Sequence, residues 1–125
     1  MIEDIRDVLD DVVDRLLRLP ESRLTVAGPD GRTVAAAGHE VAQRLADTAA
    51  GVEAREEPAP PDSRPVPWLG PFVVAHQVAL TGADLLAAGV GLDASVPVWV
   101  KASRRDLGAV LVDCAALLQE FRRRL

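Results

Sequence analysis

The chain begins with an amphipathic pattern that predicts a helix over residues 2–19. Acidic side chains recur on one side of this segment, and Pro20 follows it, where a proline disfavours helical backbone in the preceding residue. The row of acids is more typical of a solvated face than of a docking surface for a basic partner. The opposite side is an apolar stripe with the three-and-four spacing of a helix: Ile2, Ile5, Leu9, Val12, Leu16 and Leu19.

The next segment predicts a β-hairpin followed by a short helix. Residues 24–27 and 33–36 are strand-like, and residues 28–31 read Gly-Pro-Asp-Gly, a sequence that favours a tight turn. Residues 39–50 then alternate apolar and polar positions with a helical period and predict a helix with one apolar face.

A proline-rich segment divides the chain near its middle. Residues 52–57 predict a weak, charged edge strand, and residues 58–71 then hold six of the nine prolines. Neither a helix nor an inner strand tolerates that density of proline, so a long loop with polyproline-like stretches is expected. Trp68 and Leu69 are interpreted as pinning this loop to the body of the domain. The alternative makes them exposed anchors for a partner or lid residues over a pocket.

Two further strands are predicted over residues 72–80 and 85–92. The first is rich in valine, and the second is a continuous apolar run between turn residues, as in a central strand with both faces covered. His76 lies in the middle of the first and is typical of a hydrogen-bonded or surface histidine. If the domain has a ligand pocket, His76 and Gln77 are its best polar candidates.

The start of the closing helix has two interpretations. Ser95 can serve as the N-cap with Pro97 in the first turn, where proline costs little. Alternatively, Ser103 caps the helix, and the alternating valines of residues 96–100 form an extra strand. The first interpretation is favoured, because Pro97 would confine a strand to the edge of a sheet.

The closing helix has more apolar surface than a sheet alone can cover. Every residue of 107–118 except Asp113 is apolar or glycine. We therefore expect the first helix, or another chain, to cover a second side. The arginines at 122–124 are expected to complement the helix dipole and to meet acids of the first helix.

Composition excludes several functional classes. A net charge of -5 argues against nucleic-acid binding, and the single Cys114 excludes an internal disulfide and a cysteine-built zinc site. The acidic N-terminus and the absence of an apolar run of about 18 residues predict a cytoplasmic protein without membrane contact. The alanine- and arginine-rich composition suggests a GC-rich bacterial genome. A triad of Ser103, His76 and Asp84 lacks any supporting motif, so no enzyme, cofactor or metal is expected.

The predicted order, helix, two strands, helix, three strands, helix, resembles the roadblock family of the profilin-like fold. The local match is Asp93-Ala94-Ser95-Val96-Pro97-Val98 with Arg104-Arg105 downstream, together with the Pro29-Asp30-Gly31 turn. This resemblance implies one α/β (α+β) domain over residues 1–125. Its centre would be an antiparallel five-stranded sheet with helices on both faces, in the order α-β-β-α-β-β-β-α.

The resemblance also implies a non-catalytic homodimeric interaction module that regulates or scaffolds a small GTPase and pairs through sheet edges and the second helix. A competing similarity joins residues 91–93 to residues 103–107 and resembles a minimal GAF-like sensor domain, which implies a small regulatory ligand. The candidate partner or dimer contacts are Val41, Leu45, Trp68, Leu69 and Trp99.

Overall fold

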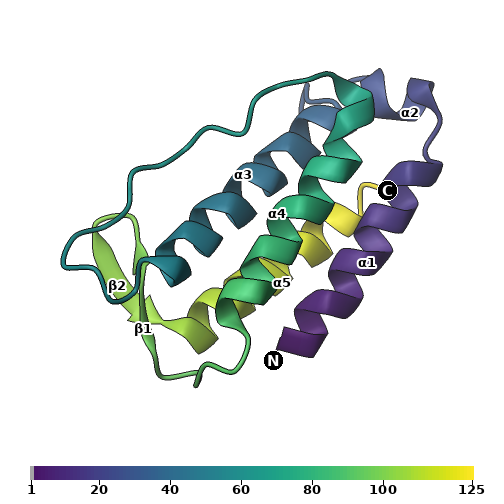
Figure 1. The fold of residues 1–125 in the computed structure, drawn as a ribbon. Coiled ribbons are helices and arrows are strands. Elements are labelled where there is room, and N and C mark those ends of the chain that lie inside the picture. The colour runs from purple at the N-terminus through teal and green to yellow at the C-terminus, as the bar shows by residue number, and fades with distance from the viewer. Residues whose placement is uncertain (1) are drawn as a thin grey trace.

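A computed structural model of the chain describes residues 2–125 and shows a four-helix bundle with a small hairpin at one end (Figure 1). The long helices are α1 (Ile2–Arg18), α3 (Val34–Glu53), α4 (Val74–Gly89) and α5 (Leu107–Arg122). The short elements are α2 (Glu21–Thr25), the 3-10 turn η1 (Pro71–Val73), and the strands β1 (Pro97–Val100) and β2 (Ser103–Asp106).

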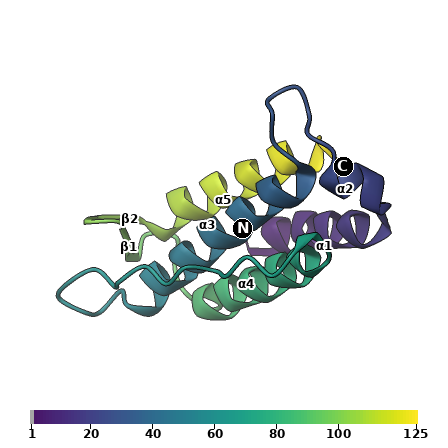
Figure 2. The ribbon, with the colours of Figure 1, turned by 90° about the horizontal axis from the view of Figure 1, so that it is seen from above.

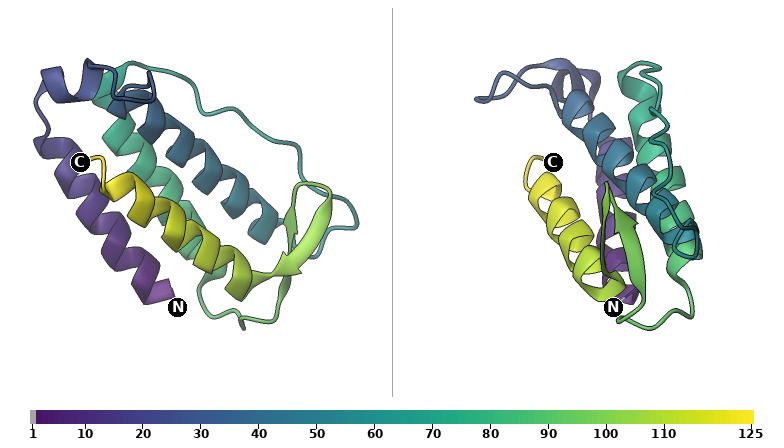
Figure 3. Two further views of the ribbon diagram at one scale, coloured as in Figure 1. Left: turned by 180° about the vertical axis from the view of Figure 1, so that it is seen from behind. Right: turned by 90° about the vertical axis from the view of Figure 1, so that its left-hand side faces the viewer.

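The long helices surround a single core. The packed pairs are α3 with α4, α4 with α1, α1 with α5, and α5 with α3. Helices α3 and α4 run in the same direction, and α1 and α5 run in the opposite one (Figures 1 and 3). The segment between α3 and α4 therefore has to return along the whole bundle.

This architecture overturns the predicted fold class. The described residues are mostly helical, and their only sheet has two antiparallel strands rather than five. Both the profilin/roadblock-like and the GAF-like interpretations require a central sheet, so neither describes this fold.

The largest error concerns residues 72–92, where the two predicted strands are replaced by η1 and the single helix α4. The turn-forming residues between the predicted strands lie inside this helix. The Thr81 hydroxyl donates to the Gln77 carbonyl one turn earlier, at 2.8 Å. At Gly82 the absence of a side chain leaves room for Leu9 of α1. These residues adapt the helix to its neighbours instead of ending a strand.

The hairpin predicted over residues 24–36 is also wrong, although its turn is present. Gly31 has a φ of +77° and its N–H donates to the Gly28 carbonyl at 2.9 Å. This turn closes only one isolated bridge, between Ala27 and Thr33. Thr33 then caps α3, because its hydroxyl accepts the Ala36 N–H at 3.0 Å.

Helix α3 includes the helix predicted over residues 39–50 and extends it in both directions. Residues 52 and 53 are its last turn, and residues 54–57 are turns and a bend, so the predicted edge strand is absent. Neither predicted start of the last helix is correct, since α5 begins at Leu107 after β2. The favoured interpretation, a helix from Ser95, is therefore wrong for residues 97–100, which form the strand β1 of the alternative interpretation.

Two expectations about the N-terminal helix are confirmed. Helix α1 covers residues 2–18 and buries its apolar stripe. It also packs along α5, as the excess apolar surface of the closing helix required. Arg122 of α5 meets an acid of α1, with its Nη1 3.3 Å from Asp11 Oδ2.

Polar side chains of α3 and α4 hold the proline-rich loop against the bundle. The His39 ring Nε2 lies 2.7 Å from the Val66 carbonyl, and Gln43 Oε1 accepts the Val66 N–H at 2.7 Å. Gln77 Nε2 donates to the Pro67 carbonyl at 2.7 Å. These hydrogen bonds hold the loop near Val66, and the Trp68 ring that follows contacts the His39 ring edge to face.

The hairpin packs directly on α3 at Gly51. A Cβ added at this position would collide with the backbone carbonyl oxygen of Trp99, which cannot rotate away as a side chain can. Gly51 therefore sets how closely β1 approaches the helix.

Gly51→Ala is expected to lower the free energy of unfolding by at least about 2 kcal/mol, because the hairpin must move to admit the methyl group. Gly89→Ala is the matched control, since its Cβ would meet only the Ile2 Cδ1 atom at 3.2 Å. Urea unfolding of both variants measures the difference. Equal stabilities would contradict the close packing of Trp99 on α3.

An ion pair joins the loop before α3 to the C-terminus, which lie side by side in Figure 2. Arg124 donates to both carboxylate oxygens of Asp30, at 2.7 and 3.2 Å, and the Arg32 N–H donates to the same group at 3.0 Å. Chiefly through the Arg124 hydrogen bonds, the pKa of Asp30 falls to about 2. This lies below the value of about 3.9 expected for an unfolded aspartate.

Since the folded pKa is the lower one, the pair stabilises the fold fully above about pH 4 and loses this effect as the pH falls toward 2. Asp30→Asn is therefore expected to lower the melting temperature at pH 6 and to have a progressively smaller effect between pH 4 and 2. Asp10→Asn, at an exposed position of α1, is the control. If the Asp30→Asn variant melts below the wild type by the same amount at every pH down to 2, the stabilising role of the ionised Asp30–Arg124 pair is contradicted.

Candidate functional site

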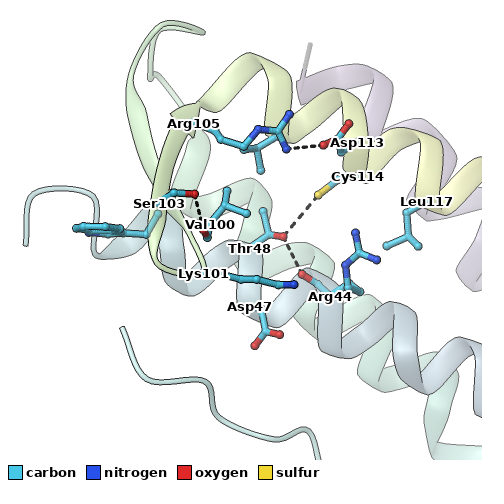
Figure 4. Close-up of a pocket in the computed structure, with 12 residues that line it drawn as sticks. Arg44, Asp47, Thr48, Val100, Lys101, Ser103, Arg105, Asp113, Cys114 and Leu117 are labelled. Atoms are coloured by element: carbon cyan, nitrogen blue, oxygen red, sulfur yellow. Dashed lines mark hydrogen bonds and ion pairs between the residues drawn. The ribbon is translucent and has the colours of Figure 1, made fainter. Parts of the chain in front are cut away.

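A pocket of about 510 Å³ opens between α3, the hairpin and α5 (Figure 4). This volume is within the range of pockets that hold small molecules. Its apolar wall includes Val100, Val110 and Leu117. Its polar side carries basic and hydroxyl groups from three separate elements.

Three basic side chains line this hairpin pocket: Arg44 of α3, Lys101 of the hairpin turn and Arg105 of β2. Arg105 is neutralised by Asp113, with Nη1 2.7 Å from Oδ2. Among the ion pairs of residues 2–125, none involves the side chains of Arg44 or Lys101. The pocket therefore offers two cationic groups that form no ion pair.

The carboxylate of Asp47 also lines the pocket, and it already accepts two hydrogen bonds from other side chains. Gln43 Nε2 and Ser63 Oγ both donate to Asp47 Oδ1, at 3.0 and 2.9 Å. Ser63 belongs to the proline-rich loop, so these bonds tie the carboxylate to the loop side of α3.

The hydroxyl and thiol groups of the pocket are not arranged for catalysis. Thr48 donates to the Arg44 carbonyl at 2.7 Å, and Cys114 Sγ lies 3.8 Å from the Thr48 hydroxyl. Burial raises the pKa of the Cys114 thiol, which opposes formation of the nucleophilic thiolate. No histidine lines the pocket.

Trp99 and Arg104 fix the hairpin to the end of α3. The Arg104 guanidinium lies 4.1 Å from the centre of the Trp99 ring and donates to the Arg55 and Glu57 carbonyls. The Trp99 indole N–H also donates to the Glu57 carbonyl, at 3.2 Å. These contacts hold the turn that carries Lys101 beside the pocket.

A second feature is the outer face of α4, which is exposed and almost uncharged. Phe72 and Leu80 are 61% and 64% exposed, which is unusual for large apolar residues of a bundle helix. His76 lies between them, and Asp84 is the only charged residue of α4. The α4 face consists of Phe72, His76, Leu80, Ala83, Asp84 and Ala87.

The candidate residues named from the sequence do not form one site. Val41 and Leu45 are buried in the core, where a partner cannot reach them. Trp68 and Leu69 are exposed at the start of η1, and the Trp68 ring meets His39 edge to face, with centroids 5.5 Å apart. Trp99 is half-buried at the hairpin pocket.

His76 and Gln77 lie on different faces of α4, one exposed and the other buried. His76 belongs to the exposed face, whereas Gln77 is buried and holds the proline-rich loop. Ser103, the third residue of the rejected triad, lines the hairpin pocket instead. Arg44 is far in the sequence from Lys101 and Arg105, so no local pattern indicates that the three share a pocket.

Comparisons with protein-family models, with curated proteins and with solved structures found no match. Residues 2–125 contain no group of three His, Cys, Asp or Glu side chains that could hold a metal ion. The continuous helical segment Pro71–Gly89 is long and apolar enough to cross a membrane, but a core helix of a soluble bundle passes the same test.

Proposed function

We propose that this protein is a non-catalytic interaction module that forms a homodimer through the α4 face. The observation that carries the proposal is the exposed apolar surface of Phe72 and Leu80 on a helix with a single charged residue. Large exposed apolar side chains that gather on one face are typical of protein–protein interfaces.

The arrangement of charge on the α4 face favours a second copy as the partner. His76 and Asp84 lie one helical turn before and one turn after Leu80. A two-fold axis near Leu80 would pack two α4 helices antiparallel, with His76 of each copy across from the turn that carries Ala83 and Asp84 of the other. An isologous dimer requires this kind of self-complementarity.

The sizes of the side chains fit the same arrangement. Phe72 lies two turns before Leu80, and Ala87 lies about two turns after it. In the antiparallel pair the phenyl ring of each copy would therefore lie over the small residues at the far end of the other helix. Small residues let two helices approach closely enough to bury such a ring.

This dimer differs from the one implied by the roadblock resemblance, which used the second helix and sheet edges. The regulation of a small GTPase stays a prediction, as does a cytoplasmic location, and the α4 interface depends on neither.

Leu80→Glu is expected to raise the dimer dissociation constant at least about tenfold, because it places two carboxylates at the centre of an apolar interface. Val112→Glu is the matched control, since Val112 is 65% exposed on α5. Sedimentation equilibrium over micromolar concentrations measures both variants. A wild-type protein that stays monomeric, or equal effects of the two variants, would overturn the proposal.

A charge exchange tests the antiparallel orientation. Asp84→Lys is expected to weaken the dimer about threefold or more, because it places a cation across from His76. Adding His76→Asp to this variant should restore affinity by recreating an opposite-charge pair with its sign reversed. If the second substitution weakens the dimer further instead, the two residues do not face each other across the interface.

A further inference from the structure

We infer that the hairpin pocket binds a small organic anion, a molecule with a phosphate or carboxylate group attached to an apolar part. This inference goes beyond the proposed dimer and does not depend on it, because the pocket lies between α3, α5 and the hairpin, which do not contribute to the α4 face.

The positive charge of the pocket lining favours an anion. The chain as a whole carries a net charge of -5, yet Arg44 and Lys101 line one pocket without an ion-pair partner among residues 2–125. Figure 4 shows the Lys101 side chain reaching across the mouth of the pocket toward α3. Of the two carboxylates at the pocket, Asp113 is paired with Arg105, and Asp47 accepts two hydrogen bonds at its loop side. The two donors to Asp47 are neutral and leave its charge in place, so the three cations and two carboxylates of the lining sum to one net positive charge, which attracts an anion.

The backbone of Lys101 has a strained conformation. Its φ of +55° makes it the only non-glycine residue with a positive φ in the described chain. Lys101 is the first of two residues in the turn between Val100 and Ser103, a position at which glycine, asparagine or aspartate is usual. A lysine costs about 1 kcal/mol there. Strained residues of this kind cluster at functional sites, where the side chain has a role that compensates for the strain.

The pocket walls combine an apolar surface with basic groups. Val100, Val110 and Leu117 supply an apolar surface. An inorganic ion would leave this surface without a partner, whereas an organic anion would cover it. Guanidinium and ammonium groups together bind phosphate and carboxylate oxygens.

Phenyl phosphate is a suitable probe, with inorganic phosphate as its anionic part alone and benzyl alcohol as an uncharged aromatic compound of similar size. In ¹⁵N–¹H NMR titrations we expect phenyl phosphate to shift the amides of Thr48, Lys101 and Ser103 with saturation in the millimolar range or below. Inorganic phosphate should bind at least about tenfold more weakly, and benzyl alcohol should not saturate. Absence of saturable shifts at the pocket with phenyl phosphate would overturn the inference.

Variants separate ligand binding from folding. Arg44→Gln should weaken phenyl phosphate binding at least about tenfold, as should Lys101→Gly, which also relieves the strained turn and should raise the melting temperature. Lys101→Arg should retain binding because it keeps the charge. Arg23→Gln, at an exposed position of α2, is the control. If Lys101→Gly binds phenyl phosphate as tightly as the wild type, the ammonium group is not a ligand contact and the inference fails.

Discussion

The parallel packing of α3 and α4 is the constraint on which the rest of the fold depends. Two consecutive helices that run in the same direction need a connection that spans a helix length, about 30 Å for the 20 residues of α3. After the turns and bends of residues 54–59, residues 60–70 do this in extended form, and their prolines favour that form because they fix φ near the polyproline value. Small residues set the closeness of the pair. A Cβ at Gly38 of α3 would lie 2.7 Å from Val74 of α4.

The sequence predicts those parts of the fold in which one physical signal dominates. The period of α1, the density of prolines in residues 58–71 and the apolar excess of α5 each have one structural solution, and each appears in the structure. The prediction for residues 72–92 is wrong because a nearly uniform apolar run has no clear period. Length and composition then have to decide between strand and helix. Valines and the Thr81-Gly82 pair favoured strands, but burial against α1 and α3 decided for a helix.

The sequence predicts the two proposed functional surfaces to different extents. The α4 face follows from a helical period through Phe72, His76 and Leu80 once the segment is known to be helical. The hairpin pocket cannot be predicted without the tertiary fold. Its residues Arg44 and Lys101 are separated in the sequence by the proline-rich loop and α4, and only the fold brings them together. The two surfaces lie on different elements, so a ligand in the pocket and a second copy on α4 can bind at the same time. Under the two proposals, the bundle would combine a pairing face with a separate binding site for a small anion.

The most direct test of the central claim is a symmetric disulfide at the proposed two-fold axis. In a Cys114→Ala background, Leu80→Cys should form a covalent dimer rapidly under mild oxidation, because the two thiols would meet at the axis. Val112→Cys, equally exposed on α5, should cross-link only slowly. Rapid cross-linking specific to residue 80 is the result that the α4 dimer predicts. Equal rates at the two positions would contradict it.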